Sequence, residues 1–278
     1  GRGLVRVGDL VGTTTDELHR VVASGLEGWR RRTLVDGSTP EDVALASGER
    51  EIRLRRTGDR WAILQPIVAR ASASRLAELM ETVDRLAFER FDEVTTETPS
   101  AVLRLEAQDR VQEIEILKAA GVGSSRLVAR VTVREHGEVV LGPVQGVIDG
   151  TGLDRLSMDG ASYLPRTLEA LPVEDIDEIV SARGVTLRRT LDGWMRGDEA
   201  AADAGAILRR LREATAQRIA IGELDRPVAT LTLRAGGIDL GDLRVATVEG
   251  ALLVTFNGIT REYTGPGAAD VAEWANSF

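Results

Sequence analysis

The sequence predicts an α+β fold of tandem repeats, in which each repeat is a mostly antiparallel sheet, made of a hairpin and a meander, packed with two helices. Two observations carry this prediction: stretches of the chain recur at a fixed spacing, and within each stretch apolar–polar alternation gives way to helical spacing. The clearest recurrence relates residues 41–61 to residues 174–194 without a gap, at a spacing of 194 − 61 = 133. Its matched pairs are Glu41-Asp42 with Glu174-Asp175, Arg50 with Arg183, Leu54-Arg55-Arg56-Thr57 with Leu187-Arg188-Arg189-Thr190, Asp59 with Asp192 and Trp61 with Trp194.

Two further recurrences set the expected domain boundaries. Pro99, Leu103, Leu105 and Ala107 return as Pro227, Leu231, Leu233 and Ala235 at 231 − 103 = 128, so one loop is expected to be 133 − 128 = 5 residues shorter in the second copy. Gly3, Val5, Gly8, Gly12 and Arg32-Thr33-Leu34 match Gly137, Val139, Gly142, Gly146 and Arg166-Thr167-Leu168 at 166 − 32 = 134. The expected organisation is therefore the C-terminal part of a preceding repeat unit in residues 1–34, a full unit in 35–168 and a nearly full unit in 169–278.

The first half of each unit is predicted to be a hairpin followed by a helix. Alternation at residues 52–55 and 61–64, separated by the turn Gly58-Asp59, predicts the hairpin, and Asp192-Gly193 is the matching turn of the second copy. Pro66 is expected to end the strand. A stripe at helical spacing then predicts a helix, with Ser72 or Ser74 as its N-cap. The stripe consists of Leu76, Leu79, Met80, Val83 and Leu86, and it is repeated by Ile207, Leu208 and Leu211.

The second half of each unit is predicted to be a meander closed by another helix. Strands are expected at residues 101–107, 111–117, 127–133 and 138–142, and Asn257-Gly258 predicts a type I′ turn in the last unit. The closing helix is predicted from the beginning of the chain, where Thr14 and Glu17 have the spacing of a capping box. Its apolar face would consist of Leu18, Val21, Val22, Leu26 and Trp29.

Composition narrows the classes of function. The net charge of −9 argues against nucleic-acid binding, because phosphates require a basic surface. No apolar run approaches the roughly 20 residues that a membrane-spanning helix needs. The chain contains no cysteine, which excludes disulfides, thiol nucleophiles and thiolate metal sites, and Lys118 is its one lysine.

The residues that would support catalysis each have a simpler structural interpretation. His19 is expected on a helix face and His136 in a hairpin turn, and neither has an oriented partner at a recognisable spacing. The Asp149-Gly150-Thr151-Gly152 sequence is only superficially like the Asp-Thr-Gly of aspartic proteases, because the second copy lacks a matching carboxylate, and a turn that opens the next helix is favoured. The sequence therefore predicts no catalytic residue.

Candidate anion and metal sites are equally weak. Gly121 to Arg126 would form a phosphate loop only before a helix, whereas the alternation of Leu127 to Val133 predicts a strand. Gly265-Pro266-Gly267 precedes a helical stretch that ends at Trp274, and a loop that sets the angle of this helix is favoured over a phosphate site. The acidic residues Asp175, Asp177, Glu178, Glu41 and Asp42 lie near prolines before the first strand of each unit, where a solvated loop is favoured over a calcium site. No cofactor and no metal are predicted.

The arginines of the hairpin are the one candidate binding surface. Arg53, Arg55 and Arg56, with Arg188 and Arg189 in the second copy, would form a patterned basic stripe on an acidic protein. Such a stripe would dock an anionic partner or lipid headgroups. The alternative is that these arginines pair with neighbouring carboxylates and contribute little.

The alternating strand that ends in the Leu-Arg-Arg-Thr-x-Asp-x-Trp hairpin, the following proline, the leucine-rich helix and the meander together resemble a bacterial envelope domain, domain of unknown function 4340. The resemblance covers most of residues 35–278 and is best at Leu54 to Pro66, Ala73 to Phe91 and Leu187 to Trp194. It implies an envelope location, genes beside ATP-binding-cassette (ABC) transporters, including gliding-motility auxiliary proteins, and a membrane anchor outside this chain. The second copy departs from the pattern, with Met195-Arg196-Gly197 in place of Gln65-Pro66.

Three hypotheses of function follow, from different classes. The favoured one is a non-enzymatic accessory or scaffold protein of the cell envelope, at its periplasmic or extracytoplasmic face, that contacts ABC transporter subunits through extended surface. The alternative is a carrier that holds a small molecule or lipid between repeat units. A hydrolase that uses carboxylates alone ranks last.

Overall fold

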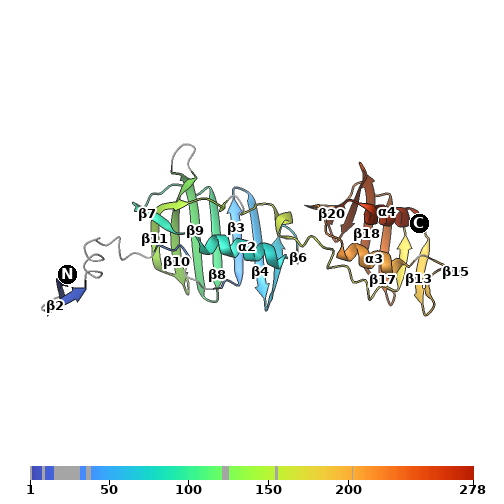
Figure 1. Cartoon of the computed structure of the whole chain (residues 1–278), viewed down its shortest axis with the longest axis horizontal. Coiled ribbons are helices and arrows are strands. Elements are labelled where there is room, and N and C mark those ends of the chain that lie inside the picture. The colour runs from blue at the N-terminus through green and yellow to red at the C-terminus, as the bar shows by residue number, and fades with distance from the viewer. Residues whose placement is uncertain are drawn as a thin grey trace. The chain divides into compact units, whose positions relative to one another are not determined.

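The computed structural model describes the backbone of residues 2–7 and 10–15 and the whole of residues 32–35, 39–120, 125–153, 156–201 and 203–278. Contacts between Cα atoms divide the chain into two compact units, Gly1–Arg53 with Ala77–Met158, and Leu54–Leu76 with Asp159–Phe278. Its main features are two nine-stranded sheets and, among the described residues, three α-helices (Figure 1). Each sheet is described by itself.

The first sheet has the strand order β6-β5-β4-β3-β8-β9-β10-β11-β7. Its two central strands, β3 and β8, are antiparallel and pair Leu45 with Leu103. A meander leads outward from each of them to an edge of the sheet. The elements are β3 Asp42–Ser47, β4 Arg50–Thr57, β5 Arg60–Gln65, β6 Ala69–Arg70, α2 Ala73–Asp84, β7 Phe88–Asp92, β8 Ala101–Ala107, β9 Arg110–Ala119, β10 Arg126–Glu135 and β11 Glu138–Asp149.

The chain crosses this sheet twice. Helix α2 connects β6 at one edge to β7 at the other, and Figure 1 shows it running across one face of the sheet. Three of its apolar residues, Leu76, Leu79 and Val83, are buried. Residues 93–100 then return from β7 to the centre of the sheet, and we call this segment the strap.

The strap lies over β11, β10 and β9. The buried Gln145 side chain of β11 accepts a hydrogen bond from the Thr95 N–H (3.0 Å) and donates one to the Glu93 carbonyl (2.8 Å). Arg130 of β10 donates to the Thr95 carbonyl (2.6 Å) and also binds Glu115, an ion pair that raises the pKa of the guanidinium. Because Glu115 and Arg130 alternate with the buried Ile114 and Val131, the strap covers the face opposite the apolar core.

Removing the Gln145 side chain tests this attachment of the strap. We expect Gln145→Ala to lower the free energy of unfolding by about 1–2 kcal/mol, because it deletes hydrogen bonds made by a buried amide. Amide exchange at Thr95 should accelerate, since its N–H loses its acceptor. Unchanged protection of Thr95 would contradict the arrangement.

The second sheet repeats the order of the first as β15-β14-β13-β12-β17-β18-β19-β20-β16. Helix α3 again joins one edge to the other, and α4 follows the last strand of the meander. Both helices contribute to one buried cluster with the strands, through Leu208 and Leu211 of α3 and Val271 and Trp274 of α4. The elements are β12 Glu178–Ser181, β13 Thr186–Thr190, β14 Gly193–Arg196, β15 Glu199–Ala200, α3 Ala204–Glu213, β16 Arg218–Ile221, β17 Ala229–Ala235, β18 Ile238–Val248, β19 Ala251–Phe256, β20 Ile259–Tyr263 and α4 Pro266–Asn276.

Most predicted elements of the meander and hairpin are confirmed. The strand β5 ends at Gln65, before Pro66, and α2 begins directly after Ser72. Asn257 and Gly258 have φ values of 52° and 73°, as a type I′ turn requires. The second hairpin turn is Leu191-Asp192, one residue earlier than predicted, because Thr190 pairs with Gly193.

Strand β11 is much longer than its predicted range of 138–142. The predicted range ends at Gly142, but the strand passes through a register shift there and continues to Asp149. The shift lies between the pairs Val131 with Val144 and Val133 with Leu141. The register shift thus allows the strand to contain Pro143, which has no N–H to donate to the ladder.

The predicted five-residue shortening is divided between connections rather than confined to one loop. The Trp61 carbonyl accepts from the Ala71 N–H, and the Trp194 carbonyl accepts from the Ala201 N–H, which gives spacings of 71 − 61 = 10 and 201 − 194 = 7. Three residues are therefore lost before α3. In that interval Gly197, with φ 60°, forms a tight turn between β14 and β15 where the first copy has Pro66.

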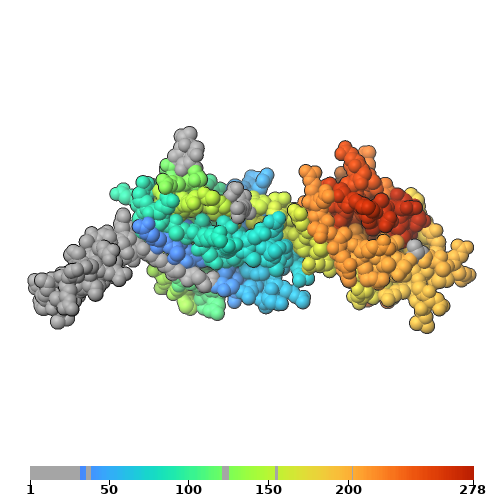
Figure 2. All heavy atoms as spheres, in the orientation of Figure 1, coloured from blue at the N-terminus to red at the C-terminus, as the bar shows by residue number. Residues whose placement is uncertain are grey.

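The tripeptide echo of Arg32-Thr33-Leu34 has a structural counterpart. The Arg32 carbonyl accepts from the Phe88 N–H (2.7 Å), and the Arg166 carbonyl accepts from the Ala216 N–H (2.9 Å). In the space-filling view the blue atoms of residues 32–35 lie against the teal atoms of the α2 to β7 part of the chain (Figure 2). Each tripeptide therefore packs beside the segment that follows the first helix of its sheet.

The beginning of the chain forms a separate hairpin. Strands β1 Arg2–Val7 and β2 Leu10–Thr15 pair with each other in a two-stranded sheet. The sequence match at a spacing of 134 aligns β1 and β2 with residues 136–149, most of which form the single strand β11. This part of the match therefore does not relate equivalent strands. Thr14, predicted to cap the closing helix, is instead paired with Gly3 in β2, and the predicted helix from Glu17 to Trp29 lies outside the described residues.

Candidate functional site

The arginines of β4 lie at the surface of the first sheet. Ile52 and Leu54 are buried, so the alternating Arg53 and Arg55 point away from the core, whereas Arg56 is half-buried near the turn. Arg53 Nε binds Glu51 Oε1 at 2.6 Å, and Arg56 donates to the Gly58 carbonyl at 2.9 Å. In the predicted stripe Arg53 and Arg55 are therefore exposed and Arg56 is half-buried, and the bonds of Arg53 and Arg56 stay within their own hairpin.

The arginines of β13 occupy equivalent positions on the second sheet. Arg188 follows the buried Leu187, as Arg55 follows Leu54, and both arginines are exposed. Arg188 Nε binds Glu178 Oε2 at 2.7 Å across the β12–β13 ladder, and this bond lowers the pKa of Glu178 with help from Arg234. Such exposed pairs are worth at most about 1 kcal/mol each. The two alternatives weighed from the sequence, an exposed stripe and local pairing, therefore coexist.

The sequence match of Glu41-Asp42 with Glu174-Asp175 does not relate residues at equivalent positions in the two sheets. The Glu41 N–H donates to the Glu106 carbonyl, and Asp177 makes the equivalent bond to the Arg234 carbonyl. Asp177 and Glu178 therefore take the place of Glu41 and Asp42 at the start of the sheet. The gapless match fails here because the segment from Asp177 to Leu187 is three residues shorter than the segment from Glu41 to Leu54: the spacing is 177 − 41 = 136 at its start and 187 − 54 = 133 at its end.

The acidic residues before these strands bind neighbouring groups of the protein. Glu178 holds two arginines, and Asp177 accepts a hydrogen bond from the Gly236 N–H at 2.8 Å. Within the described residues no group of three or more His, Cys, Asp or Glu side chains is placed to hold a metal ion.

The remaining sequence candidates are turns. His136 lies in the turn between β10 and β11 with φ 51°, and its exposed Nε2 is 3.3 Å from Asp109 Oδ2. Hydrogen bonds from the Thr151 side chain and then from its N–H lower the pKa of the Asp149 carboxyl, and the N–H bond closes the turn predicted there. His19 and Gly121 to Ser124 lie outside the described residues, while Arg126 begins a strand, as predicted.

Helix α4 begins at Pro266, as the prediction of a loop before a helix requires. Gly265 lies at the N-cap with φ 98°, and no side chain caps the helix. Proline at the first helical position fits a helix start, because its missing N–H has no intrahelical acceptor there.

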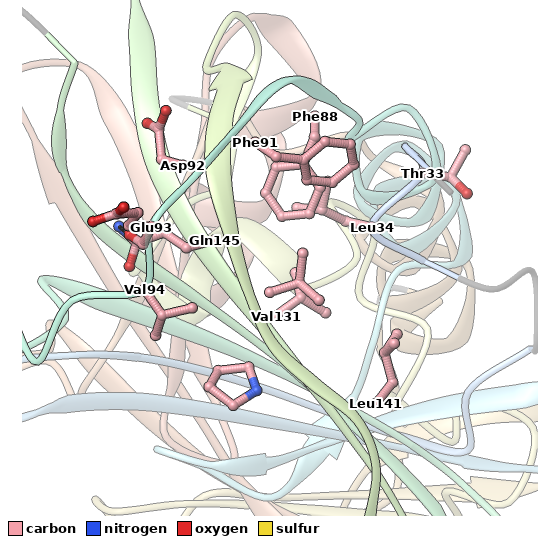
Figure 3. Close-up of a pocket in the computed structure, with 12 residues that line it drawn as sticks. Thr33, Leu34, Phe88, Phe91, Asp92, Glu93, Val94, Val131, Leu141 and Gln145 are labelled. Carbon is pink, nitrogen blue, oxygen red and sulfur yellow. Dashed lines mark hydrogen bonds between the residues drawn. The ribbon is translucent and has the colours of Figure 1, made fainter. Parts of the chain in front are cut away.

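A pocket that the sequence did not reveal lies at the edge of the first sheet, with a volume of about 640 Å³. Figure 3 shows Phe88 and Phe91 together, with Val131 beneath them and Val94 and Leu141 to either side. The rings of Phe88 and Phe91 are 5.2 Å apart. The lining residues are Thr33, Leu34, Phe88, Phe91, Asp92, Glu93, Val94, Val131, Leu141, Pro143, Val144 and Gln145.

The pocket is apolar at its base and acidic at its rim. Leu34, Phe88 and Val131 are buried, whereas Val94 and Leu141 are about half exposed, at 49% and 50%. The Asp92 carboxylate is paired with Arg90. The Gln145 amide is hydrogen-bonded to the backbone of the strap, so the polar groups that face solvent at the rim are mainly carboxylates.

Strand pairing explains the position of this pocket. Strand β7 pairs only with Gln145 to Ile148 of β11, and β11 continues to Glu138. In the second sheet, every residue of β16 pairs with β20, from Arg218 with Glu262 to Ile221 with Ile259. The sequence did not indicate the pocket because it did not indicate the length of β11. The pocket lies where the short β7 ends beside the longer β11.

Strand β20 of the second sheet contains the buried Arg261 and Tyr263, which the sequence also did not single out. Arg261 is 3% exposed, and burial lowers the pKa of its guanidinium, which donates one bond to the Pro165 carbonyl at 3.3 Å. Among the described atoms, Arg261 Nε and the Tyr263 hydroxyl are buried without a hydrogen-bond partner. Burial raises the pKa of Tyr263 to about 12.

Among the helices in the described part of the chain, none has the length and apolar character needed to cross a bilayer. Comparison with known proteins found no protein-family model, no curated protein and no solved structure that matches this chain.

Proposed function

We propose that the protein is a non-enzymatic scaffold that acts through protein contacts along its sheets. The observation that carries this proposal is the duplication of a nine-stranded sheet with exposed arginines at equivalent positions, Arg55 on β4 and Arg188 on β13. Duplication of a surface adds contact sites that reinforce each other, so modest individual contacts produce tight overall binding. A repeated exposed face has no comparable advantage for a single catalytic centre.

The chemistry of these arginines favours an anionic partner surface. A guanidinium has five N–H groups in a planar fork, and the bonds of Arg53 to Glu51 and of Arg188 to Glu178 use one N–H each. Bidentate binding of a partner carboxylate would exchange one exposed ion pair for another at little cost. The net charge of −9 makes such a local basic strip the part of the surface that attracts acidic groups.

The location and partner in this proposal rest on the resemblance to the envelope domain. The protein would work at the extracytoplasmic face of a bacterial membrane, with an ABC transporter as its partner. Among the described residues the first sheet has one α-helix, α2, and the second has two, α3 and α4. The carrier and the carboxylate-dependent hydrolase remain predictions of lower rank.

Affinity capture with arginine variants tests this function. The tagged chain would be used to capture proteins from detergent-solubilised native membranes, followed by mass spectrometry. We expect recovery of transporter permease and ATPase subunits, and at least a tenfold loss when Arg53, Arg55, Arg56, Arg188 and Arg189 are replaced by glutamine. Glutamine removes the positive charge but keeps a polar side chain with N–H donors, and it places no new charge beside Glu178.

The matched control replaces five other exposed arginines by glutamine, which changes the net charge equally. These are Arg60, Arg85, Arg134, Arg183 and Arg218. Capture that survives the first set of substitutions, or falls equally with the control set, would refute the role of the arginine strands. Recovery of no transporter subunit would refute the proposed partner.

A further inference from the structure

The step at the edge of the first sheet is an unfilled strand position. Strand β11 is paired with β10 along its length, but its other side is paired with β7 only from Gln145 to Ile148. Within the described residues, the stretch Glu138 to Val144 therefore has a neighbour on one side only. The pocket of about 640 Å³ lies at the start of this vacant position, where β7 ends at Asp92.

The side chains along the vacant position are apolar. Val139, Val140 and Leu141 are 49%, 53% and 50% exposed on a strand whose inner side pairs with β10 through two register shifts. A strand edge of this kind is a template for another strand, because its outward backbone groups lack partners. Pro143 has no N–H, so it sets the limit of regular pairing beside the pocket.

We propose that this edge binds an extended segment of a partner protein, which adds a strand beside Glu138 to Leu141 and places one large apolar side chain in the pocket. Main-chain hydrogen bonds would supply much of the affinity, and the pocket would select the anchor residue. Its apolar base, formed by Leu34, Phe88 and Val131, suits a leucine, isoleucine or phenylalanine. This site is separate from the arginine strands and does not depend on their role.

The charge of the rim specifies the flanking residues of the segment. Glu93 at the pocket and Glu138 at the far end of the free edge are both exposed carboxylates. A segment with lysine or arginine on either side of its apolar core would place a cation near each of them. A second copy of this chain pairing edge to edge would instead bring acidic rims together, which disfavours self-association at this site.

Selection from a random library of twelve-residue peptides displayed on phage tests this inference with the full chain. We expect enriched peptides to alternate apolar residues around one large anchor and to carry flanking lysine or arginine. Amide exchange at Glu138 to Leu141 should slow severalfold when a synthetic form of such a peptide binds. The affinity should fall as salt rises, since the flanking cations are exposed.

Leu141→Arg is the decisive variant, because it places a cation on the exposed edge at a pocket-lining side chain that is 50% exposed. We expect it to weaken the selected peptides at least tenfold. The matched control is Ile238→Arg, which adds the same charge at an exposed strand residue of the second sheet, where Ile238 is 70% exposed. Glu93→Gln with Glu138→Gln should reduce affinity for cationic peptides and flatten the salt dependence.

Three results would overturn the proposal. If no class of peptides is enriched on the native chain relative to Leu141→Arg, the edge does not recruit a strand. Equal binding of selected peptides to both proteins would place their site elsewhere. A dimer of the native chain in sedimentation equilibrium that Leu141→Arg dissociates would make a second copy the occupant.

Discussion

Gly146→Ala is expected to lower the free energy of unfolding by about 3 kcal/mol, because no space exists for a side chain where β7 meets β11. A Cβ atom on Gly146 would lie 2.2 Å from the Arg90 carbonyl oxygen and 2.7 Å from a ring carbon of Phe88. The first contact is with backbone, so β7 itself would have to move outward. The measurement is urea unfolding followed by circular dichroism.

Gly267→Ala is the matched control for this substitution. No atom lies within 4 Å of the position of its Cβ, and Gly267 is in the first turn of α4. Alanine there should stabilise the protein by about 0.5 kcal/mol, because it restricts the unfolded chain and favours helix. Equal unfolding midpoints for the two variants would contradict the close packing of β7 on Gly146.

Alkaline pH is expected to destabilise the second unit by up to about 3 kcal/mol for each of the chain's two tyrosines between pH 10 and 12. Burial raises the pKa of Tyr163 and of Tyr263 to about 12, whereas an exposed tyrosine titrates near 10. The unfolded chain therefore loses its phenolic protons first. The stabilising contribution is complete below about pH 10 and is lost as the pH rises towards 12.

Both tyrosines are reporters of this effect, because phenolate absorbs near 295 nm. Absorbance should stay low past pH 10 and rise together with unfolding measured by circular dichroism. Tyr263→Phe should reduce the alkaline loss and stabilise the chain by about 1 kcal/mol at neutral pH, since it removes a buried hydroxyl that has no partner among the described atoms. A smooth titration near pH 10 without unfolding would show that the tyrosines are exposed.

The sequence predicted the repeated hairpin and meander because these elements are short and local. The alternation of Ile52 to Arg55 and the Asn257-Gly258 turn each specify their structure within a few residues. The same local patterns could not predict how strands pair across the sheet. The place of β7 beside β11, and hence the pocket, follows from two chain crossings that no short pattern encodes.

Comparison of the two sheets shows why the sequence match between the two copies does not reveal the pocket. Strand registers make Val131, Val144 and Gly146 equivalent to Phe256, Ile259 and Arg261. In the first sheet a Phe88 ring carbon lies against Gly146, whereas Ala216 is the residue equivalent to Phe88 in the second. These positions exchange large and small residues, so the cores differ although the topology is shared. A match based on identical residues omits every one of them.

The pairing of β3 with β8 has a consequence for the order of folding. Leu45 and Leu103 are neighbours in this ladder, yet 103 − 45 = 58 residues separate them in the chain, whereas β8 to β11 connect through short turns. Closing so long a loop costs entropy that local hairpins do not pay. We therefore expect each meander to assemble early and the central ladder to form in the rate-limiting step, so that substitutions at Leu45 and in the β19–β20 hairpin should both slow folding more than they accelerate unfolding.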